Sequence, residues 1–250
     1  MSDASDKIDL AQNHAERVRD WLESPLGNLL LAEEHRLLEE ELARYFGGFL
    51  VHYGMQRASA AQATQIQRNV RLGPDGCAAD VICDEESWPL CEHAADVVVL
   101  QHALDFSLSP HALLREAAHS VRPGGHLLIV GINPFSTWGL RSVLAQDVLG
   151  EARCISASRL VDWLNLLGFA LEKRRVGCYR PPLASPAWQS RLAWLERFGS
   201  SWQAPAAGFY ILVARKLVVG LRPLRPSRRE PRGKLVPMPV AKVSRHQSEK

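Results

Sequence analysis

The sequence lacks any apolar run long enough to cross a membrane. Its longest nearly uninterrupted apolar segments cover residues 97–100 and 127–132, far short of the ~20 residues that a bilayer-spanning helix needs. The first ten residues, MSDASDKIDL, also lack the basic and then apolar pattern of a secretory signal peptide. We therefore expect a cytoplasmic protein with no membrane partner.

Metal-ligand and disulfide patterns are also missing. The five cysteines include no C-x-x-C pair, and the nine histidines form neither an H-x-x-x-H nor an H-E-x-x-H spacing. An odd number of scattered cysteines suits neither a disulfide framework nor a structural zinc site. Reduced thiols and no metal site are the expectation.

Charge is distributed unevenly along the 250 residues. Residues 215–250 carry 11 basic and 2 acidic residues, whereas residues 1–214 carry 19 basic and 25 acidic residues. The proline-rich basic end predicts a disordered tail over residues 217–250. Such a tail can contact a nucleic acid or another polyanion weakly through phosphate charge. Its lack of aromatic residues slightly favours the alternative, a solubilising extension.

Apolar periodicity predicts the rest of the architecture. Helical spacing of apolar residues begins at Ala15 and again at Leu30, so residues 1–44 are expected to form an N-terminal helical segment with a frayed start. Strand-like and helix-like segments then alternate over residues 45–216, which is typical of a doubly wound α/β domain with a mostly parallel sheet and helices on both faces. The last strand follows a long insert and is expected to run antiparallel. The seven predicted strands cover residues 49–51, 69–72, 79–83, 96–100, 126–131, 169–175 and 209–214, with helices over 58–67, 111–121 and 156–167 and a loop over 133–150.

Residues 94–130 resemble a known family. A strand beginning with Asp96, a helix and an R-P-G-G turn into the next strand are similar to the class I S-adenosylmethionine (SAM)-dependent methyltransferases, in particular the type 11 methyltransferase domain. The resemblance extends upstream to residues 83–90 and downstream to residues 158–173 and 208–216, about two thirds of the chain. It implies a Rossmann-like sheet, SAM as cofactor and methyl transfer to an unidentified acceptor.

The resemblance also implies where SAM would bind. In open α/β sheets, ligands lie beyond the carboxyl ends of the strands. On the family's pattern Gly54 lies under the cofactor, Asp84 faces the adenine amino group with Glu85 beside it, and Gln101 and His102 line the methionine end. The alternatives are structural: Gly54 as a turn residue, Asp84 as a capping or solvated residue and His102 as a core histidine.

The chain departs from the family at its glycine-rich loop. The positions that align with the acidic residue and three glycines are His52, Gly54, Gln56 and Ala58, so one glycine remains. Glycines let a ligand approach the backbone without a Cβ in the way. The acidic residue expected after the second strand is represented only by Asp75. A methyltransferase-like binding or scaffold protein with a degenerate SAM site is therefore the alternative function.

No catalytic residue is predicted, because methyl transfer from a sulfonium needs alignment rather than a nucleophile and base. The segment that follows the fifth strand begins at Asn133, and its Asn-Pro-Phe is interpreted as a loop rather than a methylation signature. Asn133 and Trp138 are expected to line the acceptor pocket, with the indole as a flat apolar wall. The tryptophans Trp188, Trp194 and Trp202 are expected to belong to the core.

Overall fold

The computed structural model describes residues 2–57, 61, 63–183, 191, 192, 194 and 206–218, with side chains from residue 12 onward. The described residues belong to one compact unit, which ends at residue 218. The basic tail beyond residue 218, as well as Trp188 and Trp202, therefore lies outside the described residues. Trp194 is described and half of its surface is exposed, so its predicted core position is wrong. No helix in the described part of the chain is long and apolar enough to span a bilayer.

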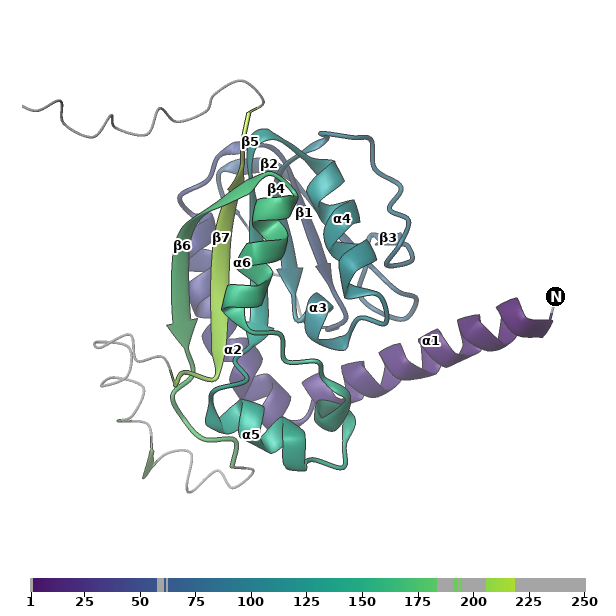
Figure 1. Cartoon of the computed structure of the whole chain (residues 1–250), viewed down its shortest axis with the longest axis vertical. Helices are drawn as coiled ribbons and strands as arrows, with labels where there is room; N and C mark the ends of the chain where they lie inside the picture. Colours follow the sequence, from purple (N-terminus) through teal and green to yellow (C-terminus); the bar gives the residue numbers. More distant parts are fainter. Residues whose placement is uncertain are drawn as a thin grey trace, which may run out of the picture. The chain divides into compact units, whose positions relative to one another are not determined.

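Seven strands form one sheet in the spatial order β3-β2-β1-β4-β5-β7-β6 (Figure 1). Neighbouring strands run parallel except where β7 pairs with β5 and β6. The chain moves outward from β1 to β3 and then returns to β4 on the other side of β1, which places the switch in strand order between β1 and β4. The predicted mostly parallel, doubly wound sheet and its antiparallel last strand are confirmed. The strands are β1 (Gly47–Gly54), β2 (Ile66–Gly73), β3 (Val81–Ile82), β4 (Ala95–Gln101), β5 (Val121–Ile132), β6 (Phe169–Gly177) and β7 (Phe209–Lys216).

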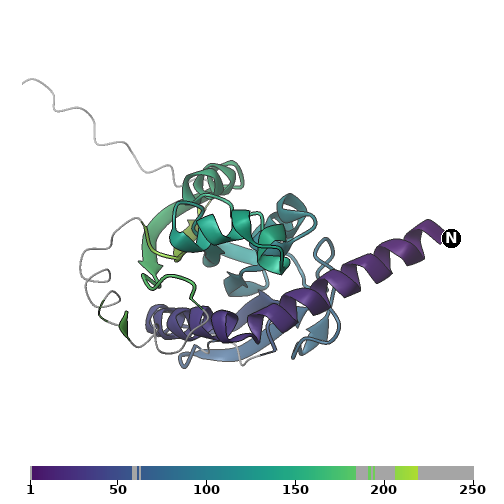
Figure 2. The same cartoon turned by 90° about the horizontal axis from the view of Figure 1, so that it is seen from below.

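Helices cover both faces of this sheet (Figure 2). One buried cluster joins α1, α2 and α5 to one face, and a second joins α4 and α6 to the other. Strand β4 is buried along its whole length because successive residues face opposite helical layers. The helices are α1 (Ser2–Leu22), α2 (Pro25–Leu42), α3 (Ala103–Phe106), α4 (Pro110–Ser120), α5 (Thr137–Leu144) and α6 (Ala157–Leu166), with a 3₁₀ helix η1 (Val148–Glu151).

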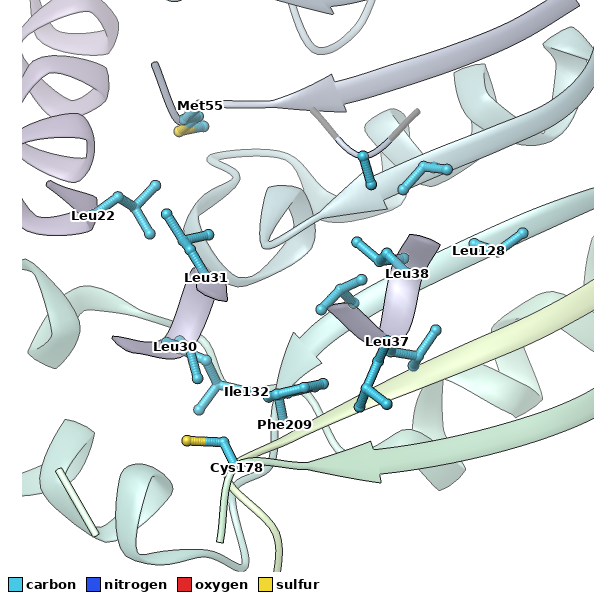
Figure 3. Close-up of a cluster of buried hydrophobic side chains, with 14 of the residues drawn as sticks. Leu22, Leu30, Leu31, Leu37, Leu38, Met55, Leu128, Ile132, Cys178 and Phe209 are labelled. Atoms are coloured by element: carbon cyan, nitrogen blue, oxygen red, sulfur yellow. The ribbon is translucent and has the colours of Figure 1, made fainter. Parts of the chain in front are cut away.

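Helix α2 contributes much of the first cluster. Its leucines repeat at helical spacing, and Figure 3 shows Leu30 beside Ile132 of β5 and Leu38 near Leu128 of β5, whereas Leu31 lies toward Leu22 and Met55. Burying each such side chain contributes about 1.5–3 kcal/mol. The leucines of this stripe are Leu30, Leu31, Leu37 and Leu38.

The loop predicted over residues 133–150 is wrong, because the segment contains α5 and η1. Ser136 caps α5, and its hydroxyl accepts a hydrogen bond from the Gly139 backbone N–H at 3.1 Å. Trp138 then docks the helix on the core, fully buried. Tertiary burial of one tryptophan thus stabilises a helix too short to be recognised from periodicity.

Three other local predictions also differ from the structure. The predicted helix over residues 58–67 gives way to a turn and the start of β2, because Ile66 pairs with Gly47 in the sheet; residues 58–60 and 62 lie outside the described part. The N-terminal helix begins at Ser2, earlier than expected. The predicted turn at residues 123–125 is a bulge within β5, where the pairing with β4 shifts register.

Candidate functional site

A cavity of about 620 Å³ opens where the first three strands of the sheet end. Such a position is the usual place for ligands in open α/β sheets, because neighbouring loops diverge at a switch in strand order. The described lining residues come from α1, the end of β1 and the segments that follow β2, β3 and α3. They are Gln12, His14, Ala15, Tyr53, Met55, Pro74, Asp75, Ile82, Cys83, Asp84, Glu85, Glu86, Ser87, Leu108 and Ser109. We call this the acidic cavity.

The lining carries four carboxylates and, among its described residues, no lysine or arginine. Asp75 and Asp84 are exposed, so both carboxylates can reach a ligand. Glu85 is held instead: its Oε2 accepts hydrogen bonds from Ser107 Oγ at 2.5 Å and from the Ser109 backbone N–H at 3.2 Å. Burial raises the pKa of Glu85, and these two hydrogen bonds partly offset the rise. The cavity therefore favours neutral or cationic ligands over phosphates.

Tyr53 of β1 forms part of the cavity wall and is fully buried. Its ring stacks on Trp88, with centroids 5.3 Å apart. Its hydroxyl oxygen is buried without a hydrogen-bond partner in the described part of the chain. Burial, followed by the charge of Glu85, raises the pKa of Tyr53, so the phenol stays protonated. An unsatisfied buried hydroxyl costs about 1–3 kcal/mol.

Helix α1 passes beneath the carboxyl ends of β1 and β4 in the view of Figure 1 and closes one side of the cavity. His14 Nε2 lies 2.9 Å from the Phe106 backbone oxygen. The guanidinium of Arg19 donates to the Asp75 backbone oxygen, which fixes the turn after β2. The two contacts tie α1 to opposite sides of the cavity.

A buried hydrogen-bonded network lies at the ends of β1 and β4, facing α2. Gln101 Oε1 lies 3.0 Å from His52 Nε2 and accepts from Gln56 Nε2 at 2.7 Å. Gln101 Nε2 donates to Glu34 Oε2 at 2.9 Å. Burial, followed by the charge of Arg71, lowers the pKa of His52 to about 4, so its ring is neutral.

His102 occupies the centre of an ionic cluster next to this network. Its Nε2 lies 2.6 Å from Glu34 Oε1 and its Nδ1 lies 2.9 Å from Asp105 Oδ2, and all three side chains are at most 2% exposed. Burial alone would lower the pKa of His102, but the two carboxylates outweigh burial and raise it to about 10. His102 is therefore an imidazolium at neutral pH, and it bridges two buried acids rather than facing a ligand.

Gln56 fills the space over Gly54. Gly54 pairs with Gln101 in the sheet, as the predicted site requires, but a Cβ on Gly54 would clash with Gln56 Oε1. Gln56 is itself 3% exposed. Arg57 points elsewhere and forms an ion pair with Glu23 at 3.2 Å. The predicted methionine end is thus occupied by the protein's own carboxamide.

Comparison with known proteins places this geometry in a family. A family model described as a methyltransferase domain matches residues 35–129. Over 222 residues the chain is 30% identical to the uncharacterized protein YafS of Escherichia coli strain K12, spanning 85% of this chain and 87% of that protein. The sheet order and the cavity at its carboxyl edge agree with that match. The chain belongs to the class I SAM-dependent methyltransferase family.

Solved structures show the same methyltransferase fold. A SAM-dependent methyltransferase from Thermotoga maritima is 17% identical, with a TM-score of 0.53 over 73% of this chain and 90% of that one. A geranyl diphosphate methyltransferase in complex with SAM is 16% identical, with a TM-score of 0.52 over 74% of this chain and 84% of that one. Sequence identity at this level supports the shared fold alone.

The predicted site residues of this methyltransferase-family chain divide into separate groups. Asp84 and Glu85 line the acidic cavity, whereas Gln101 and His102 lie in the buried network. Gly54 lies between them, beneath Gln56. Among the residues the structure describes, no group of three or more side chains is placed to hold a metal ion.

The two predicted acceptor residues lie elsewhere. Asn133 is 3% exposed, and its Nδ2 donates to the Ala207 backbone oxygen at 2.9 Å. Trp138 is fully buried, and its indole N–H donates to the Arg180 backbone oxygen at 2.9 Å. Neither side chain lines the acidic cavity: Asn133 holds the loop after β5 against the segment before β7, and Trp138 holds α5 against the segment after β6. Their role toward an acceptor stays a prediction.

Sequence reasoning missed Glu34 and Tyr53. Glu34 interrupts the apolar stripe of α2, and a carboxylate at a position that should face the core signals a buried partner. Tyr53 carries a weaker signal, since an aromatic residue inside a buried strand is ordinary. The missing hydrogen-bond partner of its hydroxyl is visible only in three dimensions.

Proposed function

We propose that the chain binds SAM, with the adenosyl group in the acidic cavity, and transfers the methyl group to an acceptor. The observation that carries the proposal is the position and charge of this cavity: it lies at the ends of the first three strands and presents the exposed carboxylates of Asp75 and Asp84. SAM is a cation that has no phosphate, so the sign of the charge suits it.

The described residues divide the recognition of the adenosyl group among them. Asp75 follows β2 and would accept hydrogen bonds from the ribose hydroxyls, and Asp84 follows β3 and would accept one from the adenine amino group. The apolar side chains of Met55 and Ile82 supply a surface for the base. Each charge-assisted hydrogen bond contributes about 1.5–3 kcal/mol.

When bound, SAM supplies an electrophilic methyl group on a sulfonium. The chain's own contribution is alignment, which can lower a barrier by about 7–11 kcal/mol. General-base catalysis by the neighbouring histidines is not part of the proposal. His102 is protonated and paired with two carboxylates, and His52 is buried against Gln101.

One observation favours a second candidate, a nucleoside-binding protein of the same fold without methyl transfer. Gln56 fills the space over Gly54 and donates to Gln101. The amino-acid end of SAM would need that space or would have to remain outside it. Under this candidate, the adenosyl group is recognised and the methionine end is not.

Isothermal titration of the full chain with SAM, adenosine and adenosine monophosphate separates these functions. The proposed methyltransferase binds SAM more tightly than adenosine, and it binds adenosine more tightly than the monophosphate because of the acidic lining. Equal affinity for SAM and adenosine indicates the second candidate. No binding at millimolar SAM by a folded protein contradicts both.

A further inference from the structure

A second cavity, of about 470 Å³, lies between the start of α4, the loop after β5 and the start of α6. Its described lining residues include two arginines, a histidine, a serine and a tryptophan, but no aspartate or glutamate. They are Pro110, His111, Pro134, Arg153, Cys154, Ile155, Ser156, Arg159 and Trp163. We call this the basic cavity.

Neither arginine is neutralised by a carboxylate in the described part of the chain. Arg153 Nη2 donates to the Leu108 backbone oxygen at 3.2 Å, which orients the guanidinium and leaves other N–H groups available. The guanidinium of Arg159 lies 5.7 Å from the centre of the Trp163 ring. His111 packs against the same ring at 3.9 Å. The cavity thus combines two positive charges with a fixed aromatic surface.

Two further features of the lining favour an anion. The side chain of Ser156 does not cap α6, so the backbone N–H groups of the first turn add partial positive charge beside Arg159. Burial raises the pKa of the Cys154 thiol to about 11, so no thiolate opposes the arginines. Guanidinium groups match carboxylate and phosphate oxygens in geometry as well as charge.

We propose that the basic cavity binds an anionic group, a phosphate or a carboxylate, of a small ring-bearing molecule. The anion would lie on Arg153 and Arg159, and the ring beside Trp163. Leu108 and Ser109 line the acidic cavity, and the next two residues of the chain line the basic one. Resting on the proposed function, we infer that this molecule is the methyl acceptor.

Titration calorimetry with phenyl phosphate, benzoate and phenol, without SAM, tests the site directly. We expect binding of one or both anions and none of phenol; the comparison of the two anions distinguishes phosphate from carboxylate. Arg159→Gln and Arg153→Gln should each weaken anion binding about tenfold, because each removes a charge-assisted contact. Arg68→Gln removes the same charge from an exposed position on β2 that lines neither cavity and should leave affinity unchanged.

The outcomes separate this inference from the proposed function. Anion binding that is lost in Arg159→Gln supports the basic cavity even if SAM fails to bind, in which case only the acceptor role is lost. SAM binding without anion binding overturns the inference and leaves the proposed function intact. Equal losses in Arg159→Gln and Arg68→Gln also overturn it, because the effect would then reflect net charge alone.

Discussion

The acidic and basic cavities lie on either side of one short segment, and their linings have opposite charge. The acidic cavity presents Asp75 and Asp84, whereas the basic cavity presents Arg153 and Arg159. Helix α3 connects the two cavities. The Phe106 backbone oxygen contacts His14 on the acidic side, and the Asp105 backbone oxygen accepts a hydrogen bond from the backbone N–H of Arg153 at 2.8 Å on the basic side.

The difference between the two cavities shows how a common fold can direct two ligands of opposite charge to neighbouring places. A cationic nucleoside is repelled by the arginines, and an anion is repelled by the carboxylates, so each ligand has one favourable place. The wall between the cavities, formed by α3 and by His102 at its N-cap, then sets their separation. Substitutions in the wall should disturb both sites, whereas substitutions in one lining should disturb one.

The largest effect, a loss of folding stability, is expected in the wall between the cavities. His102→Gln leaves Glu34 and Asp105 buried without their cation, which should destabilise the chain by about 3–5 kcal/mol. His119→Gln is the matched control, because His119 also faces a carboxylate, Glu92 at 3.6 Å, but half of its side chain is exposed. Thermal or urea unfolding measures both. A loss under 1 kcal/mol in His102→Gln would contradict the ionic cluster.

The same cluster predicts a pH dependence of stability. The folded-state pKa of His102 is raised to about 10, above the value near 6.5 expected in the unfolded chain. The contribution of protonated His102 to the free energy of unfolding is therefore complete below about pH 6.5, and it is lost as pH rises through about 10. The free energy of unfolding should fall across this range in the wild type and fall less in His102→Gln. Parallel curves for the two proteins would contradict the assignment.

The next largest effect, on ligand affinity, is expected in the lining of the acidic cavity alone. Asp75→Asn should weaken SAM binding about tenfold to a hundredfold, since it replaces a charged acceptor, whose hydrogen bonds are worth about 1.5–3 kcal/mol, by a neutral amide, and should leave phenyl phosphate binding unchanged. Asp162→Asn removes the same charge from the exposed surface of α6 and serves as the control. Calorimetry with both ligands measures the effects. If Asp75→Asn weakens both ligands equally, the two cavities do not act separately.

A smaller effect, of opposite sign, is expected at the boundary of the acidic cavity. Gln56→Gly opens the space over Gly54 and removes one hydrogen bond to Gln101, so SAM affinity should rise by up to about tenfold. Adenosine affinity should stay constant, because adenosine has no amino-acid end. Arg57→Gly controls for added loop freedom. An equal rise for SAM and adenosine would show that the opened space serves the base rather than the methionine end.

The smallest effect is expected at Tyr53. Tyr53→Phe removes a hydroxyl without a described partner, so the free chain should become more stable by about 1 kcal/mol. Unfolding curves without ligand measure this gain. If the hydroxyl is satisfied by the bound nucleoside, the same variant should bind adenosine more weakly. A loss of stability would show that the hydroxyl is already satisfied in the free chain.

Much of the fold is predictable from sequence because several strands and helices are recognisable from the residues of the segment itself. The β-branched run of β4 predicts a strand, and the turn residues around α4 predict the ends of a helix, without tertiary information. Helix α5 does not, since eight residues are stabilised mainly by the burial of Trp138. The start of β2 was predicted as a helix because its pairing partner, Gly47, is distant in sequence.

The site was less predictable than the fold. Asp84 and Glu85 could be placed at the cavity because residues 83–90 resemble the segment that carries the cofactor-facing acid in the methyltransferase family. The burial of His102 agrees with the structural alternative, a core histidine, whereas the burial of Gln101 could not be foreseen, because it depends on Glu34 arriving from α2. Arg153 and Arg159 appear unremarkable in sequence and become a pair only when α6 is placed beside α4.

A crystal structure of the chain with S-adenosylhomocysteine and phenyl phosphate tests the central claim most directly. The account predicts the adenosyl group against Asp75 and Asp84, and the phosphate oxygens on Arg153 and Arg159. Both ligands in one cavity, or an adenosyl group bound away from the acidic cavity, would contradict it.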